Sequence, residues 1–279
     1  MSQVEAPAAQ SVRAVTEEEV AFYRRNGWVH LKGLFTPELT AEVLVRVKDK
    51  MGERASADLG DNRAAIMSPE LAALWRNWQY PANEDEWFRA LAQSPQMAAV
   101  ANRLWGEARG VRFWSDTVMC KMPASEGGSK TPWHQDFPYH AMDRQGNANI
   151  WVALVDVPPE MGSMRFLNGS HRAGPMGRVI QRTDGIDLLD MYPELAEEYE
   201  ISEPLHLAAG DATVHNLCTI HYAAQNDTQD PRWAYVTGMF PADVLYTGAQ
   251  QRRTDDLDLK VNEPYDHPRF PLLVAPTIA

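Results

Sequence analysis

His134 and Asp136 are separated by one residue in the segment 131–138, TPWHQDFP. At the end of an extended strand, an imidazole and a carboxylate at this spacing can both bind one metal ion. One further histidine would complete the 2-His-1-carboxylate facial triad of non-heme iron(II) sites, which leaves coordination positions open for a co-substrate and O2. A single His-x-Asp is a weak signal, so the interpretation depends on the rest of the chain.

Two downstream histidines are candidates for the third ligand. His215 ends GDATVH (210–215), a pattern typical of a turn that leads into a strand, and His221 begins HYAAQN (221–226). They are six residues apart, so both can face the same side of one strand, and the residues alone leave the choice open. The other histidines have no comparable partner pattern and are interpreted as surface or core residues: His30, His140, His171, His206 and His267.

Arg232 follows His221 by eleven residues. In a hairpin, a residue shortly after the turn returns beside the first strand, so Arg232 can point into the same cavity as His221. A guanidinium binds a carboxylate through two parallel hydrogen bonds. A metal and an arginine at opposite ends of a small pocket would suit a dicarboxylate that chelates the metal through one end.

The elements that would position these residues change in type near residue 110. Before it we expect a helix that begins with a capping box at Thr16, a strand over 28–35, and a helix from Thr36-Pro37 to Gly52, followed by helices over 69–79, 84–92 and 95–105. After it, short β-branched and aromatic runs alternate with turns, which is typical of a sandwich or barrel. The predicted strands are 111–122, 149–157, 164–167, 204–208, 212–217, 219–223 and 232–240.

The sequence predicts one domain over residues 15–279, with a helical N-terminal part (15–107) and a flexible tail at 1–14. The polar stretch 53–67 is predicted to be a loop. The charged insertion 172–202 is long for a compact β domain, so both segments are lid candidates.

Composition limits the classes of partner. The formal net charge is −12, which disfavours nucleic acid and anionic membranes because both require a basic surface. No stretch reaches the roughly 20 apolar residues of a membrane span, and the first residues lack the apolar core of a signal peptide. The two cysteines, Cys120 and Cys218, form no disulfide framework. We therefore expect a cytoplasmic protein with a small-molecule substrate, as a monomer or homodimer.

In these motifs the chain resembles the phytanoyl-CoA dioxygenase (PhyH) family of Fe(II)/2-oxoglutarate oxygenases. The resemblance runs from Trp28 to about Tyr246, and its ordered motifs are GWVHLKGLF (27–35), WHQD (133–136), IWVAL (150–154), GSMRFLNGSH (162–171), and then His221, Asn226 and Arg232. It implies a mainly β fold with flanking helices and a double-stranded β-helix core, which is a jelly roll of the cupin type.

The resemblance also implies roles for individual residues. His134, Asp136 and His221 would be the iron ligands, since the family spacing to Asn226 and Arg232 favours His221 over His215. Arg232 would bind the distal carboxylate of 2-oxoglutarate, and Lys121 matches a family position near the co-substrate. The family often has a hydroxyl two residues after the distal histidine. Here that residue is Ala223, so Thr131 or Thr213 is a candidate replacement.

The implied cofactors are Fe(II), 2-oxoglutarate and O2, with release of succinate and CO2. Because Asp136 keeps the carboxylate that related halogenases lack, we expect oxidation of a small molecule, such as a secondary metabolite, rather than halogenation. Hydroxylation of an acyl-CoA, desaturation, epoxidation, ring closure, a non-catalytic binding protein and a zinc hydrolase are the alternatives. Aromatic residues that flank the ligands are predicted to line the pocket: Trp133, Phe137, Tyr139 and Tyr222, with His215 on the substrate side and Trp151 beside the co-substrate.

Overall fold

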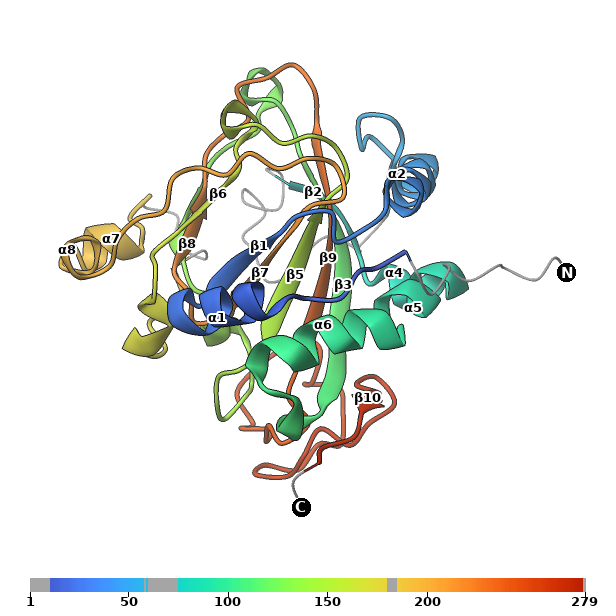
Figure 1. The fold of residues 1–279 in the computed structure, drawn as a ribbon, viewed down its shortest axis with the longest axis vertical. Coiled ribbons are helices and arrows are strands. Elements are labelled where there is room, and N and C mark those ends of the chain that lie inside the picture. Colours follow the sequence, from blue (N-terminus) through green and yellow to red (C-terminus); the bar gives the residue numbers. More distant parts are fainter. Residues whose placement is uncertain (1–10, 58, 60–74, 180–184, 278–279) are drawn as a thin grey trace, which may run out of the picture.

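Two antiparallel sheets form the centre of the protein, in a computed structural model that describes residues 11–57, 59, 75–179 and 185–277. The larger sheet has the order β1-β7-β5-β9-β3-β10, with β2 paired to β3, and the smaller sheet has the order β4-β8-β6. Figure 1 shows their arrangement. The strands are β1 (Trp28–Leu31), β2 (Trp75–Gln79), β3 (Val111–Lys121), β4 (Thr131–His134), β5 (Ala148–Ala153), β6 (Met164–Phe166), β7 (Ala212–Asn216), β8 (His221–Ala223), β9 (Arg232–Phe240) and β10 (Leu272–Val274).

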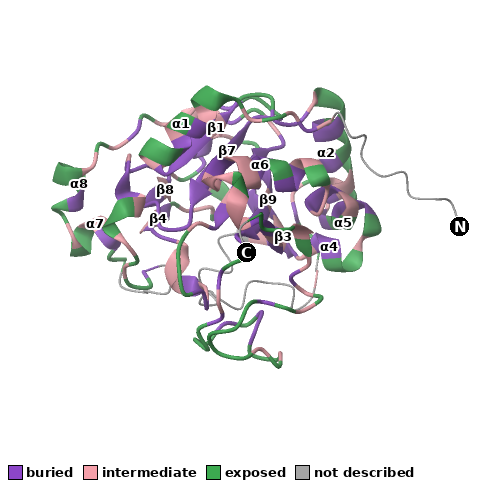
Figure 2. Ribbon diagram, turned by 60° about the horizontal axis from the view of Figure 1, so that its bottom comes forward, coloured by how far each residue is buried: buried purple, intermediate pink, exposed green. Residues whose placement is uncertain are grey.

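Helices pack against the larger sheet and supply much of the main apolar core (Figure 1). They are α1 (Glu17–Asn26), α2 (Pro37–Met51), α4 (Pro81–Glu84), α5 (Glu86–Ala92) and α6 (Pro95–Trp105), with α7 (Leu188–Met191) and α8 (Leu195–Glu198) in the later insertion. Figure 2 shows that the central strands are buried and the outer faces of the helices are exposed. Within the described ranges, no helix is long and apolar enough to cross a membrane.

Several predicted elements are confirmed by their end signals. The Thr16 side chain accepts from the Glu19 backbone N–H, and the Glu19 carboxylate accepts from the Thr16 N–H, so the predicted capping box is formed. Gly27 ends α1 with φ of 79°, a left-handed conformation that glycine adopts without strain. The predicted mainly β fold with flanking helices is therefore confirmed.

Two predicted elements are wrong. The helix predicted over 69–79 is a strand over its described part, because β2 pairs in register with β3 and pairing to a neighbouring strand overrides local propensity; residues 69–74 lie outside the described residues. The strand predicted at 204–208 is reduced to one bridge between Val157 and Leu207.

The predicted tail and loop are only partly described. Residues 1–10, 58 and 60–74 lie outside the described residues. Most of the predicted loop 53–67 is therefore not described. Within the predicted tail, Val12 is buried and bridges Phe35, so the described residues 11–14 pack against the domain.

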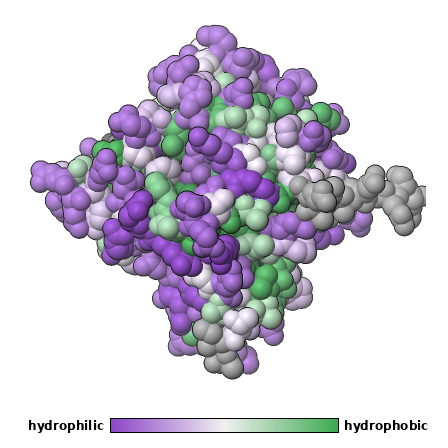
Figure 3. All heavy atoms as spheres, viewed as in Figure 1, coloured by the Kyte–Doolittle hydropathy of each residue, from purple (hydrophilic) through white to green (hydrophobic). Residues whose placement is uncertain are grey.

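The insertion 172–202 is described except for residues 180–184. Leu188 and Leu195, from its two short helices, pack with Leu167 and Ile220 of the smaller-sheet region. The surface shown in Figure 3 is largely hydrophilic, with apolar residues in small separate groups. This agrees with the acidic net charge of −12.

Asp116 on β3 is a buried carboxyl group beneath the helices. It accepts hydrogen bonds from the Ala82 N–H and from the Tyr235 hydroxyl at 2.8 Å, but burial raises its pKa to about 7. Because the folded-state pKa lies above the unfolded value, the folded protein loses stability as pH rises from about 4 through 7.

We predict that Asp116→Asn reduces this pH dependence. Between pH 5 and pH 8 the unsubstituted protein should lose about 2 kcal/mol more free energy of unfolding than the variant. Urea denaturation of both proteins at both pH values measures the difference. An equal loss in the two proteins would mean that Asp116 does not retain a proton in the fold.

Candidate metal centre

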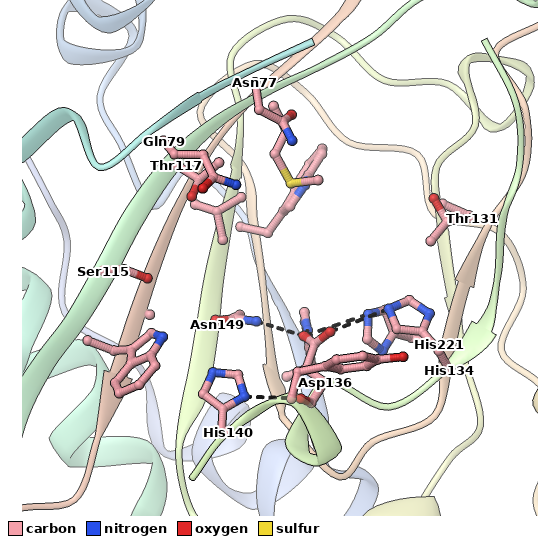
Figure 4. Close-up of a pocket in the computed structure, with 18 of the residues that line it drawn as sticks. Asn77, Gln79, Ser115, Thr117, Thr131, His134, Asp136, His140, Asn149 and His221 are labelled. Carbon is pink, nitrogen blue, oxygen red and sulfur yellow. Dashed lines mark hydrogen bonds and ion pairs between the residues drawn. The ribbon is translucent and has the colours of Figure 1, made fainter. Parts of the chain in front are cut away.

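His134, Asp136 and His221 meet where the smaller sheet faces the cavity. His134 ends β4 and is paired in register with His221 at the start of β8, and Asp136 follows in the next turn. One ligand atom from each residue lies within 4.8 Å of the other two. The two imidazole rings are 4.1 Å apart between centroids, and Figure 4 shows both directed toward Asp136. The cluster has the size and donor types of a metal site.

The backbone fixes which nitrogen of each histidine faces the centre. Nδ1 of His134 lies 2.7 Å from the Pro132 carbonyl oxygen, and Nδ1 of His221 lies 3.0 Å from that of Thr219. A carbonyl only accepts, so each Nδ1 carries the proton and each Nε2 presents a lone pair to the centre. Burial and the neighbouring His134 and His215 keep the pKa of His221 well below its usual value, which preserves the neutral form that binds metals.

The larger sheet holds the Asp136 carboxylate from the other side. The Asn149 side-chain amide donates to Asp136 Oδ2 at 2.7 Å, and His215 Nε2 lies 3.2 Å from the same oxygen. Although burial raises the pKa of Asp136, His221 and His134 lower it more, so the pKa lies well below its usual range. An ionised carboxylate and two imidazoles are a suitable donor set for a divalent iron ion.

His215 lies beside this centre and contacts the carboxylate from β7. Its ring is 4.4 Å from that of His221, and its buried Nδ1 has no hydrogen-bond partner among the described residues. The cluster of ligand atoms within 4.8 Å contains His221 and not His215. His221 is therefore the histidine that completes the cluster, and the role predicted for His215 stays a prediction.

Arg232 lies at one end of the same cavity, at the start of β9. Its side chain is buried, Nη1 donates to the Gly162 carbonyl, and Cζ lies 5.2 Å from the centre of the Trp151 ring. Nε is buried and has no acceptor within the described part of the chain. Burial lowers the pKa to about 10, so the group is charged at neutral pH. A charged guanidinium with a free donor fits a carboxylate.

Thr131 and Lys121 lie near this end in different environments. Thr131 lines the cavity and is paired in register with Ala223, and its predicted contact with the co-substrate stays a prediction. The Lys121 amine donates to the carbonyls of Ala223 and Ala224, the latter at 2.6 Å, and the cavity lining does not include it. Burial and Arg232 lower its pKa to about 6. Thr213 is fully buried and lies outside the lining.

The predicted aromatic residues divide between two faces. Tyr139 and Trp151 line the cavity, as His215 does. Trp133 and Tyr222 stack on each other with centroids 5.1 Å apart and are not among the lining residues, because neighbours on a strand point to opposite faces and His221 points inward. Phe137 packs with a separate apolar cluster.

The cavity also contains residues that sequence reasoning missed. Asn149 stands two positions before Trp151 on β5, so strand alternation could have identified it. His140 lines the wall and its Nδ1 lies 3.0 Å from the Asp136 backbone oxygen. No pattern in the sequence indicated that the remaining polar and aromatic residues line the cavity: Asn77, Gln79, Tyr80, Trp114, Ser115, Thr117, Gln251 and Arg253.

Comparison with known proteins gives one family. The family model for phytanoyl-CoA dioxygenase (PhyH) matches residues 23–234. Curated relatives include phytanoyl-CoA dioxygenase domain-containing protein 1 of Danio rerio, 26% identical over 151 residues (53% of this chain and 50% of the relative), and that of Mus musculus, 28% identical over 163 residues (57% and 54%). The matches thus span about half the length of these relatives.

Solved structures give the same fold. The non-heme α-ketoglutarate-dependent carbocyclase SnoK from nogalamycin biosynthesis matches with a TM-score of 0.71 and 24% identity, covering 92% of this chain and 96% of that chain. The epimerase SnoN, in complex with Fe3+, α-ketoglutarate and nogalamycin RO, matches with a TM-score of 0.70 and 26% identity, covering 92% and 98%. The predicted double-stranded β-helix core is confirmed.

The fold and the His-Asp-His cluster are those of the 2-oxoglutarate-dependent non-heme iron oxygenases. Within this class, the chain belongs to the phytanoyl-CoA dioxygenase family.

We predict that His221→Ala abolishes binding of one Fe(II) per chain, whereas His215→Ala weakens it by about 10- to 100-fold, the usual effect of losing a group that orients a ligand. Anaerobic calorimetric titration with Fe(II) measures both, and circular dichroism of each variant checks the fold. If His215→Ala eliminated binding and His221→Ala retained it, the ligand assignment would be reversed.

Proposed function

We propose that this protein uses Fe(II), 2-oxoglutarate and O2 to oxidise a C–H bond of a small molecule, with release of succinate and CO2. The observation that carries the proposal is the combination of one cavity, three converging ligand atoms and a buried arginine at the cavity end. His134, Asp136 and His221 would hold the iron, and Arg232 would anchor the co-substrate.

The iron, when bound with 2-oxoglutarate, supplies the activation of O2 that the side chains cannot perform. The protein's own residues fix the geometry. The carbonyls of Pro132 and Thr219 hold the two imidazoles, and Asn149 holds the carboxylate. Arg232 provides a charged donor in a water-poor cavity end, where an ion pair with a carboxylate is strong. Thr131 also lines the cavity and would supply a neutral donor.

The carboxylate of Asp136 supports oxygen chemistry rather than halogen transfer. It would occupy a coordination position of the iron, and it is held by contacts from both sheets. A halide would need that position. We therefore propose oxidation, either hydroxylation or a related outcome that begins from the same C–H bond. Two solved neighbours, a carbocyclase and an epimerase, support related outcomes beside hydroxylation.

The cavity supports a small substrate rather than an acyl-CoA. Its volume is about 250 Å³, just below the roughly 300–1,000 Å³ of most ligand pockets, and co-substrate and substrate must share it. Apart from the histidines, the described cationic residues that line it are Arg232 and Arg253. The several phosphates of a CoA would require more positively charged side chains than these two. A secondary metabolite fits this setting, and the nogalamycin-pathway neighbours support it.

The remaining parts of the chain have proposed roles that fit this reaction. We propose one catalytic domain over residues 15–279, with the insertion 172–202 as a cover for the cavity. In support, Arg178 donates through Nε to the Pro138 carbonyl at 2.8 Å and lies over the ring of Tyr139, which lines the cavity.

Spectroscopy and product analysis test the function. Anaerobic addition of Fe(II) and 2-oxoglutarate should give the weak visible charge-transfer band of the chelate, and admission of O2 should give succinate. A folded protein with no band would contradict the proposal. A binding protein would give no succinate, and a zinc hydrolase would show no dependence on O2.

We predict that Arg232→Ala raises the 2-oxoglutarate concentration required for half-maximal succinate formation by about 10- to 100-fold, because a charge-assisted hydrogen-bond pair is lost. Arg232→Lys should recover part of the affinity, since it restores the charge without the planar fork. Arg252→Ala is the matched control, because Arg252 is exposed and lies outside the cavity lining. An unchanged requirement in Arg232→Ala would contradict the anchor assignment.

A further inference from the structure

Arg253 is a second buried arginine in the cavity and has no role in the reaction as described. Its side chain is 5% exposed, and it lines the cavity from the C-terminal segment, beyond the family-model match at 23–234. Nε and Nη2 are buried, and neither has a hydrogen-bond acceptor among the described residues. These two nitrogens form one edge of the guanidinium, with two parallel donors that match a carboxylate.

The surroundings of Arg253 stabilise the cation, and the Tyr80 hydroxyl lies close enough to interact with the guanidinium, but Nε and Nη2 have no acceptor among the described residues. Cζ lies 4.4 Å from the centre of the Tyr80 ring and 5.6 Å from those of Trp114 and Phe270. Aromatic faces attract a cation but accept no strong in-plane hydrogen bond. Burial lowers the pKa of Arg253, while the Tyr80 phenol and Asp116 oppose that shift. A charge held this way is costly unless a ligand supplies an acceptor.

The segment that carries Arg253 is fixed in place. The Gln251 side chain accepts from the Arg253 backbone N–H at 2.5 Å and donates to the Tyr139 carbonyl at 3.2 Å. Arg269 donates to the Arg253 carbonyl at 2.9 Å and also binds Asp256 through both terminal nitrogens. Such backbone anchoring holds a binding group ready before the ligand arrives.

Strand register places Arg253 at the opposite end of the cavity from Arg232. Lys121 and Arg232 are paired at one end of the β3–β9 ladder, and Ser115 and Gly238 are paired six residues away, roughly 20 Å along the strand. Arg253 contacts Trp114, the neighbour of Ser115, and Trp114 packs on His140. Figure 4 shows Ser115 and His140 on the side away from Thr131, with the metal ligands between.

We infer that Arg253 is the substrate anchor, and that the substrate carries a carboxylate, which the Arg253 guanidinium binds while the carbon to be oxidised lies over the metal ligands. The inference rests on the proposed function, since it assigns the second cation to the substrate because Arg232 serves 2-oxoglutarate. The aromatic wall of Tyr80, Trp114 and Tyr139 favours an apolar or aromatic body next to the carboxylate.

The test uses the protein loaded anaerobically with Fe(II) and saturating 2-oxoglutarate. The probes are 3-phenylpropanoate and its amide, 3-phenylpropanamide, which are alike in shape and differ in charge. Calorimetric titration should show that the acid binds at least about tenfold more tightly than the amide. The charge-transfer band must persist, which shows that the acid has not displaced 2-oxoglutarate from Arg232.

Two variants then assign the preference to one residue. Arg253→Met should remove the preference for the acid, and Arg252→Met, the neighbouring exposed arginine, should keep it. Arg253→Met should also unfold at an equal or higher temperature than the unsubstituted protein, because it removes a buried charge of which Nε and Nη2 have no acceptors. If Arg253 instead served to stabilise the fold, Arg253→Met would unfold at a lower temperature than the unsubstituted protein.

Specific outcomes overturn the inference. One is equal binding of acid and amide by the unsubstituted protein. Another is a preference for the acid that survives in Arg253→Met. A third is loss of the preference for the acid in Arg252→Met as well as in Arg253→Met. Failure of the proposed function is distinguishable, since it would appear earlier as absence of the charge-transfer band on loading.

Discussion

The Asp136 carboxylate is the group on which the site depends, because both sheets converge on it. Asn149 and His215 reach it from the larger sheet, and His134 and His221 from the smaller one. Three imidazoles around one partly buried carboxylate leave imidazole lone pairs and carboxylate oxygens facing the same small space. Such a space is electrostatically suited to a cation. The register between β4 and β8, which places His134 opposite His221, is therefore a functional constraint as well as a structural one.

The cavity contains polar groups that the fold alone does not satisfy. Nε of Arg232, Nε and Nη2 of Arg253 and Nδ1 of His215 are all buried without partners among the described residues. Each such group reduces the stability of the free protein, since buried donors that lose water normally gain another partner. Buried polar atoms without partners also occur away from the cavity, for example on Tyr23 and Asn102, but those that line it are placed where a bound ligand can supply the missing partner.

The sequence predicted the site better than it predicted the cavity around it. His134, Asp136, His221 and Arg232 could be identified because metal ligation and carboxylate binding limit residue type and spacing, and the family motifs fix their order. Trp133 and Tyr222 were placed in the pocket because they adjoin ligands in sequence, but strand alternation turns them outward. The strand β2 was predicted as a helix because its pairing with β3 depends on residues some 40 positions away.

Arg253 shows why the rest of the site could not be predicted from the sequence. Its position also has a consequence for specificity. No local pattern marks it, since the turn at 251–255 that holds it in place is built from contacts with Tyr139 and Arg269. The metal ligands and Arg232 lie on strands or directly after them, where register fixes their positions. The second arginine, Arg253, lies on a C-terminal loop packed across the cavity. Loops tolerate change more readily than strands. With the proposed anchor on such a segment, a change of residue there would alter specificity without disturbing the metal ligands. This arrangement makes the C-terminal segment the place where substrate preference should be sought.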